Sequence, residues 1–242
     1  PCLMHILTLN AEEGTVMAKQ MKISTRLGIG FASILALLVV IAAITFFNVD
    51  ALIKISKWVD HTNEVIGTAS NTLEQLVNME TGERGFLITG KDNYLEPFEK
   101  GKKTFSDLIA KGRQLTNDNP AQVQRWDKLQ QMQNEWLEKV AAPEIAARRE
   151  VTKQSMTMDS LIQKVETGSG KTFMDGMRGV ISDIIAAEEG LLKTRSEEAE
   201  GKAGFTKSAT LVGSLVALLL GVAISVLITR KLQSQLGEDP GY

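Results

Sequence analysis

The sequence is poor in the residues that stabilise disulfide-linked folds. Cys2 is the only cysteine among 242 residues, so no disulfide can form within the chain. Five prolines and an aromatic content of 5% favour long helices joined by few turns. The formal net charge of -2 gives no argument for nucleic acid as a partner. The fold must therefore be held by packing alone.

The sequence also lacks the residue sets of catalytic and metal sites. Apart from His5, the only histidine is His61, and no metal-ligand cluster or nucleophile motif accompanies it. We expect His61 to be a surface residue. The stretch TGSGK at 167–171 resembles part of a phosphate loop, but the G-x-x-x-x-G-K-[ST] spacing and a preceding strand are missing. We expect no catalytic, cofactor-binding or metal-binding residues, and no enzymatic activity.

What the sequence does contain is a run of 23 residues without a charge, at 27–49. As a helix it would be about 34 Å long, enough to cross a hydrocarbon core of roughly 30 Å. A buried helix of a soluble protein would be shorter and interrupted by polar residues. A cleavable signal peptide is the closer alternative, because Lys22 and Arg26 precede the run. The run exceeds an ordinary signal-peptide core of about 7 to 15 residues and lacks a clear cleavage site, which favours an uncleaved signal anchor.

A second uncharged run of 22 residues lies at 208–229, and Arg230 and Lys231 follow it directly. Two membrane spans place both chain ends on one side of the membrane and the segment between them on the other. Lysine and arginine flank both ends of each span, so they do not fix the orientation. We place the ends in the cytoplasm and the intervening domain outside, because a signal anchor normally leads a long following domain outward.

The predicted domain organisation has five segments. They are a leader that is disordered or not native (1–20), a cytoplasmic start with the first span (21–49), an extracytoplasmic helical bundle (50–207), the second span (208–229) and the start of a cytoplasmic linker (230–242).

Apolar residues continue beyond the first span on one face only, at alternating spacings of four and three. These residues are Ile55, Val59, Thr62, Ile66, Ala69, Leu73 and Leu76. No Gly or Pro pair separates this face from the span. We therefore predict one helix from about residue 27 to residue 87.

Three turns divide the rest of the domain. Residues 88–96 contain Gly90 as a helix end and Asp92 or Asn93 as an N-cap, with Pro97 near the start of the next helix. The stretch TNDNP at 116–120 is the clearest break, and 167–171 is a further turn. Pro143 should kink its helix without ending it.

The later helices have apolar faces of the same kind. The second carries Phe98, Phe105, Leu108 and Leu115; the third carries Val123, Trp126, Leu129, Trp136 and Val140; the last carries Phe173, Met177, Val180, Ile184, Ala187 and Leu191. The predicted fold is all-α: a membrane-anchored, up-down-up-down four-helix bundle whose first and last helices are continuous with the two transmembrane helices.

The same helical register places two carboxylates, Glu80 and Glu83, where apolar residues are expected. Carboxylates near a core destabilise the fold unless they are paired. Arg84, or Arg178 on a neighbouring helix, could close a buried ionic network with them. We favour a structural role for this network, and contact with a ligand is the alternative.

Small residues recur at intervals of four in both spans, and they allow close helix contact in lipid. They are Gly28, Ala32 and Ala36 in the first span, and Gly213, Ala217, Gly221 and Ser225 in the second. Ordinary span composition explains them equally well.

Four stretches of the domain carry a family resemblance. ETGERGFLITG at 80–90, followed by YLEPF at 94–98, resembles the signature of the third subtype of CHASE domains, which are extracytoplasmic helical sensor modules of bacterial receptors. The stretches at 136–149 and 177–195 are similar to later parts of that family. Residues 236–242 resemble the linker that opens the HAMP region in many methyl-accepting chemotaxis proteins.

The resemblance implies the sensory and transmembrane part of a bacterial chemoreceptor in the inner membrane. It also implies an unidentified small-molecule or protein stimulus, and cytoplasmic signalling partners reached through an output domain beyond Tyr242. The resemblance and the small-residue stripes together suggest a homodimer, and the two uncharged runs predict membrane lipid around the spans. The alternatives are the sensor part of a membrane histidine kinase or other signalling enzyme, and a purely structural membrane-anchored bundle.

Overall fold

The computed structural model describes residues 23–236, and this part of the chain contains helices and turns but no strand. The predicted all-α fold is confirmed. The chain divides into two compact units. One is Ile55–Glu198, and the other contains the described residues on either side of it. The prediction for residues 1–20 lies outside the described residues, and so does the part of the predicted linker (230–242) that follows residue 236.

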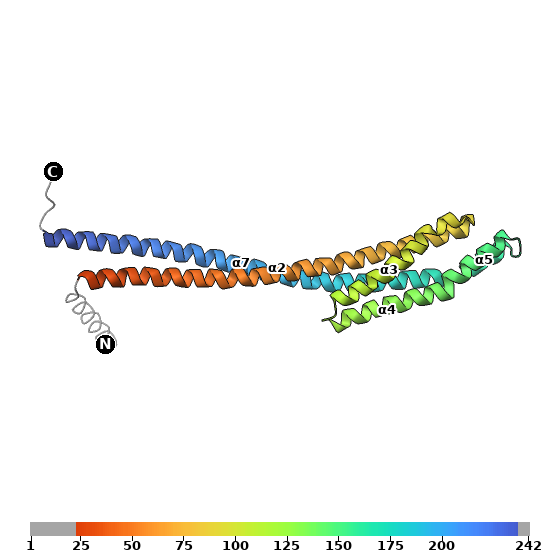
Figure 1. Ribbon diagram of the computed structural model, residues 1–242, viewed down its shortest axis with the longest axis horizontal. Helices are drawn as coiled ribbons and strands as arrows, with labels where there is room; N and C mark the ends of the chain where they lie inside the picture. The colour runs from red at the N-terminus through yellow and green to blue at the C-terminus, as the bar shows by residue number, and fades with distance from the viewer. Residues whose placement is uncertain (1–22, 237–242) are drawn as a thin grey trace, which may run out of the picture. The chain divides into compact units, whose positions relative to one another are not determined.

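Two long helices carry the uncharged runs. Helix α2 is Ile23–Thr89 and helix α7 is Ser169–Leu236 (Figure 1). Each contains an 18-residue window with a mean hydropathy of 2.8 and no buried residue, so both are long and apolar enough to cross a membrane. The predicted helix from residue 27 to residue 87 lies within α2 and is confirmed.

Within the unit that contains both runs, the two helices meet through small residues. A Cβ on Gly213 would lie 2.7 Å from Ile41, and one on Gly30 would lie 3.2 Å from Ile224. The hydroxyl oxygens of Thr45 and Thr210 are 3.4 Å apart. The predicted stripe of the second span is half-buried here except for Ser225, whereas the predicted stripe of the first span is exposed.

The unit Ile55–Glu198 contains the remaining elements (Figure 1). In chain order they are the 3₁₀ turn η1 (Asp92–Leu95), α3 (Glu96–Leu115), α4 (Pro120–Trp136), the π-helical turn η2 (Leu137–Ala141), α5 (Ala142–Thr152) and α6 (Met158–Val165). They pack with the adjoining parts of α2 and α7.

Contacts between neighbouring helices close this unit into a ring. Helix α2 meets α3 where Gly101 leaves room for Met79, and α3 meets α4 where Gly112 lies against Trp126. The Gln122 side chain on α4 donates to the Ile184 carbonyl oxygen of α7 at 3.2 Å. Arg195 of α7 lies over the Trp58 ring of α2, 5.0 Å from its centroid. The order α2, α3, α4, α7 and back to α2 is that of a four-helix bundle.

A single apolar core runs along the bundle. Its largest fully buried side chains are Trp126, Trp136, Phe86, Phe105, Leu76, Met79, Ile109, Leu129, Leu161, Met174, Met177 and Ile181. Six of these twelve, Leu76, Phe105, Trp126, Leu129, Trp136 and Met177, lie on the apolar faces that the sequence predicts, because a face with spacings of three and four points to one side of a helix.

The observed faces differ from the predicted ones on several helices. On α2 the predicted Ile66 and Leu73 are half-buried. On α3 Ile109 is buried, whereas the predicted Leu108 and Leu115 are half-buried. On α7 the predicted Leu191 is 38% exposed, whereas Glu188 is buried. Glu188 accepts a hydrogen bond from Gln122 at 2.7 Å, so a polar pair takes the core position.

The predicted turns at Gly90 and at 116–120 are present. Gly90 has a φ of 68° and its N–H donates to the Phe86 carbonyl oxygen at 2.7 Å. Asn119 accepts from the backbone N–H of Gln122 and caps α4, with Pro120 as the first helical residue. The N-cap predicted at Asp92 or Asn93 is wrong, because these residues form η1 and Leu95 precedes α3 without a side-chain cap.

Pro143 leaves its helix continuous, as predicted. The π-helical turn η2 comes immediately before it, and the Ala142 N–H donates to the Leu137 carbonyl oxygen, five residues back. A π-helical turn tolerates the N–H that proline lacks and leaves room for the proline ring.

The sequence pattern did not predict the chain reversal between α5 and α6, because neither glycine nor proline occurs there. Gln154 adopts a φ of 61° there, and Thr157 then caps α6 by accepting from the Ser160 N–H. The turn predicted at 167–171 is present around Gly168, which has a φ of 71°. It separates α6 from α7, which both belong to the part of the bundle in which the chain runs back.

Candidate functional site

The last turns of α2 are packed closely against the segment that follows them. A Cβ on Gly82 would lie 2.7 Å from the Phe98 backbone nitrogen, and one on Gly85 would lie 2.8 Å from the Tyr94 ring. These glycines therefore let α2 approach α3 and η1 more closely than any larger residue would allow. Gly82 and Gly85 of the ETGERGFLITG stretch are therefore needed for the close packing of α2 against α3 and η1.

The C-terminal end of α2 is held from α5. Arg148 Nε donates to the Leu87 carbonyl oxygen at 2.8 Å, which satisfies one of the acceptors that a helix end leaves unpaired. A Cβ on Gly90 would collide with the Arg148 guanidinium group. Arg148 and Gly90 together fix where α2 stops.

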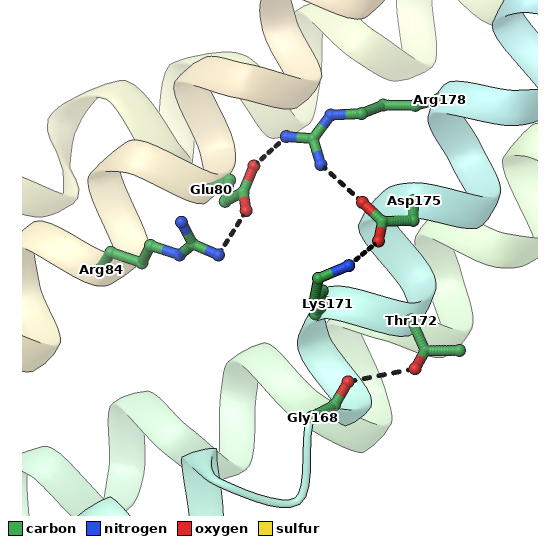
Figure 2. Close-up of polar contacts among 7 residues, drawn as sticks. All are labelled: Glu80, Arg84, Gly168, Lys171, Thr172, Asp175 and Arg178. Atoms are coloured by element: carbon green, nitrogen blue, oxygen red, sulfur yellow. Dashed lines mark hydrogen bonds and ion pairs between the residues drawn. The ribbon is translucent and has the colours of Figure 1, made fainter.

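A ladder of alternating charges joins α2 to α7 (Figure 2). Arg84 Nη2 lies 2.7 Å from Glu80 Oε1, and Arg178 pairs with the other oxygen of Glu80. Arg178 Nη1 also lies 3.2 Å from Asp175 Oδ1, and Asp175 pairs with Lys171. The Glu80 side chain is only 10% exposed, whereas that of Arg84 is 63% exposed. Of the four residues singled out from the sequence, the structure joins Glu80, Arg84 and Arg178.

Glu83 is buried beside this ladder and does not join it. It is 5% exposed, and its Oε1 has no hydrogen-bond partner. Glu144 of α5, which is 7% exposed, lies close enough for its charge to act on Glu83. Burial and, secondly, the charge of Glu144 raise the pKa of Glu83 to about 8. Burial raises the pKa of Glu144 as well, against the charge of Lys164.

Glu144 is the member of this site that the sequence reasoning missed. The signal was present, because the apolar face of the third helix passes through Trp136 and Val140 and reaches position 144 with the same spacing. A carboxylate in that register is a candidate of the same kind as Glu80 and Glu83.

A partly enclosed cavity of about 270 Å³ connects these groups. Its walls come from α2, the last residue of α4, α5, α6, the turn at Gly168 and the start of α7. The lining includes Glu80, Glu83, Arg84, Trp136, Glu144, Gly168, Lys171 and Met174. An apolar groove of about 400 Å³ adjoins it, sharing Arg84, Leu87 and Val165, and adding Ile88, Met158, Leu161, Ile162 and Glu166.

The side chains that line this cavity are suited to binding a cation or a proton. Among residues 23–236, no group of three or more His, Cys, Asp or Glu side chains is placed to hold a metal ion. Two buried carboxyl groups that form no ion pair favour either a proton or an added cation.

A second, more open cavity of about 550 Å³ lies elsewhere on the bundle, near Trp58, His61, Glu64, Lys111 and Asp118. His61 is half-buried, and its ring centroid is 5.7 Å from that of Trp58. Lys111 and Glu64 form an ion pair of 2.8 Å with both side chains half exposed. Exposed, mutually paired charges of this kind indicate a solvated surface.

Comparison with protein families gives one match. The model of the CHASE3 domain matches residues 55–198, which are the bounds of the compact bundle unit. Neither a curated protein nor a solved structure matches the chain. Two helices able to cross a membrane flank the matched unit, as in a two-pass membrane protein with an extracytoplasmic segment. The chain therefore belongs to the CHASE3 family, whose domains are the extracytoplasmic sensory parts of signalling proteins.

Proposed function

We propose that this chain is the sensory and transmembrane part of a bacterial chemoreceptor. The observation that carries the proposal is the CHASE3 unit at 55–198 placed between two apolar segments of helix. The resemblance of residues 236–242 to the linker before a HAMP region favours the methyl-accepting chemotaxis type. The sensor part of a membrane histidine kinase is the alternative, because it would use the same sensor and the same spans.

The proposed mechanism is a small relative movement of helices. Helix α2 contains both the first apolar run and residues of the sensor unit, and α7 contains both the last bundle helix and the second run. Repacking of α2 against α7 inside the sensor would then move one span against the other. Packed helices favour discrete shifts of about 1 to 2 Å over continuous deformation. Such a movement needs no catalysis, and we propose that this part of the protein is not an enzyme.

The proposed topology is two-pass in the inner membrane, with both ends cytoplasmic and residues 50–207 periplasmic or extracellular. We further propose a homodimer that signals to cytoplasmic partners in response to an unidentified small molecule or protein. Reporter fusions after Lys111 should behave as extracytoplasmic, and fusions after Gln233 as cytoplasmic. The opposite pattern contradicts the topology.

The gene sequence beyond Tyr242 tests the choice of output. A HAMP region followed by a long cytoplasmic coiled coil selects the chemoreceptor. A kinase core with a phospho-accepting histidine selects the sensor kinase. A gene that ends without any signalling domain contradicts both and leaves a structural bundle.

A further inference from the structure

Glu83 and Trp126 are the two residues of the described chain that have a buried side-chain polar atom without a hydrogen-bond partner, and of these only Glu83 can carry a charge. It is 5% exposed, it lines the 270 Å³ cavity, and its Oε1 has no hydrogen-bond partner. Buried polar atoms of folded proteins almost always have a partner, so an unpaired carboxyl oxygen on a residue that lines a cavity requires an explanation, and a bound proton or ligand is one. Glu144 lines the same cavity from the opposite arm of the bundle.

The distribution of charge around the cavity is uneven. Glu80 is paired with both Arg84 and Arg178, whereas no ion pair of the described residues includes Glu83 or Glu144. Lys171 also lines the cavity, but it is paired with Asp175 and its side chain is 75% exposed. Arg84, Arg178 and Lys171 are therefore engaged with other carboxylates, and Glu83 and Glu144 form no ion pair, although the charge of Lys164 on α6 acts on Glu144.

We propose that this cavity binds a small organic ammonium ion, with its NH₃⁺ group between Glu83 and Glu144 and its apolar chain along the adjoining groove. An ammonium group supplies three N–H donors and one positive charge, which match two carboxyl groups that form no ion pair within the described chain. The groove begins where the cavity ends, since both are lined by Arg84, Leu87 and Val165. This ligand class rests on the sensor role proposed above, because it names what that sensor would detect.

Two other occupants fit the site less well. The described residues form no group of three ligands that could hold a metal ion. A carboxylate ligand would have to use Arg84 and Lys171, whose side chains are 63% and 75% exposed and already paired with acidic residues. A carboxylate ligand would also add its own negative charge beside two buried carboxyl groups. The apolar groove adds a preference for an alkyl or aryl ammonium over a fully hydrated ion.

Binding should be coupled to the release of a proton. The charged groups that face Glu83 are Glu80 and Arg84 from α2, Glu144 from α5 with Lys164 of α6 near it, and Lys171 from α7. Since burial raises the pKa of Glu83 to about 8, its carboxyl group is protonated at neutral pH and an ammonium ion must displace that proton. The apparent affinity should rise about tenfold per pH unit below that pKa and level off above it.

The test uses the whole chain in lipid nanodiscs and three probes of equal length: hexylammonium, 1-hexanol and hexanoate. Titration calorimetry, with blank nanodiscs subtracted, should show hexylammonium binding and the other two not. At pH 7, buffers of different ionisation enthalpy should show release of close to one proton. Butylammonium should bind more weakly than hexylammonium, by about fourfold for each methylene that the groove buries.

Two variants separate the site from general electrostatics. Glu83→Gln should weaken hexylammonium binding at least tenfold and abolish proton release. Glu138→Gln, which removes an exposed charge from η2 outside the cavity, should change neither. Thermal unfolding of both variants checks that they are folded.

Three results would overturn the proposal. Tighter binding of hexanoate would assign the site to anions at Arg84 and Lys171, equal binding of hexanol would reduce it to an apolar groove, and failure of hexylammonium at millimolar concentration would remove the ligand class. None of these depends on signalling. When the chain is fused to a chemoreceptor signalling domain, a fusion that binds hexylammonium but gives no output would contradict the proposed function alone. A fusion that signals without binding hexylammonium would contradict only this inference.

Discussion

Arg178 of α7 pairs with Glu80 of α2, a residue 98 positions earlier in the chain, and Glu80 also holds Arg84 from its own helix. One buried carboxylate thus has two arginine partners. This arrangement links the two helices that contain the apolar runs, at a point inside the sensor unit. Removal of one arginine should therefore destabilise the fold less than removal of both.

Replacement of Arg84 by Ala should lower the free energy of unfolding by only about 0.5 to 1 kcal/mol. Its side chain is 63% exposed, and Glu80 keeps Arg178 as a partner. Replacement of both arginines leaves a buried carboxylate unpaired and should lower the free energy by about 3 kcal/mol, more than the sum of the single changes. Chemical unfolding of the four proteins in one double-mutant cycle measures the coupling.

Arg113→Ala is the matched control for this cycle. Arg113 lies 2.9 Å from Asp127 with both side chains about half exposed, so its loss should change stability by less than about 0.5 kcal/mol. Strictly additive effects of the Arg84 and Arg178 changes would mean that Glu80 is solvated in both single variants.

Close approach of α2 and α3 can be tested at Gly82. A Cβ there would lie 2.7 Å from the Phe98 backbone nitrogen, and a backbone atom cannot move aside without shifting a helix. Gly82→Ala should therefore lower the free energy of unfolding by about 1 to 3 kcal/mol, despite the better helix propensity of alanine. Gly179→Ala on α7 is the control, because a Cβ there would meet no neighbouring atom within 4 Å, and it should raise stability by up to about 1 kcal/mol. A stable Gly82→Ala variant would show that the two helices separate easily.

The buried carboxyl of Glu83 makes a prediction about pH. Its pKa rises from an ordinary value of 4.5 to about 8 in the fold, so the folded state holds this proton more tightly than the unfolded chain does. The stability that this group contributes is complete below pH 4.5, declines as pH rises, and is lost above pH 8, with a slope of up to about 1.4 kcal/mol per pH unit.

Glu83→Gln should flatten the stability profile between pH 5 and pH 8, and it should make the protein more stable than the parent at pH 8. Unfolding midpoints measured across this range test both statements. Glu138→Gln serves again as the control, because its carboxyl group is exposed. Parallel profiles for the Glu83 variant and the parent would mean that Glu83 is ionised and solvated in the fold.

The sequence predicts the helices of this protein better than its polar interior. A face with spacings of three and four fixes which side of α2 is buried, so Ile55, Ala69 and Leu76 were predictable. The same register pointed to Glu80 and Glu83 as buried carboxylates. It could not show that Glu80 takes both arginines while Glu83 takes none, because those partners depend on how four helices pack.

The reversal at 153–157 was unpredictable for a different reason. It contains neither glycine nor proline, and Gln154 takes the left-handed conformation that glycine usually supplies. Glu144 could have been found by extending the register of its helix past Pro143, since the π-helical turn keeps the helix continuous. The spacing of apolar residues therefore does not predict local turn conformations or charge pairs between residues far apart in the sequence.

The transmission of a signal along α7 should depend on an unbroken helix between the sensor and the second apolar run. Gly201 and Gly204 lie in that stretch, and no atom beyond their own helix lies within 4 Å of the Cβ position of either. Each lowers helix propensity by about 1 kcal/mol relative to alanine, so this is where the helix is weakest. Four glycines inserted after Gly204 should interrupt the helix while leaving the sensor unit folded and the chain inserted in the membrane.

Because the stimulus is unidentified, Arg178→Ala can replace it as a perturbation of the sensor. In a fusion of the chain to a chemoreceptor signalling domain, this substitution should shift the basal output when the α7 stretch is intact. The shift should disappear when the four glycines follow Gly204, and it should persist when they follow Gln154 in the exposed turn between α5 and α6. If the shift survives the insertion after Gly204, helix continuity is not the route of transmission, and the domain acts by anchoring or docking partners instead.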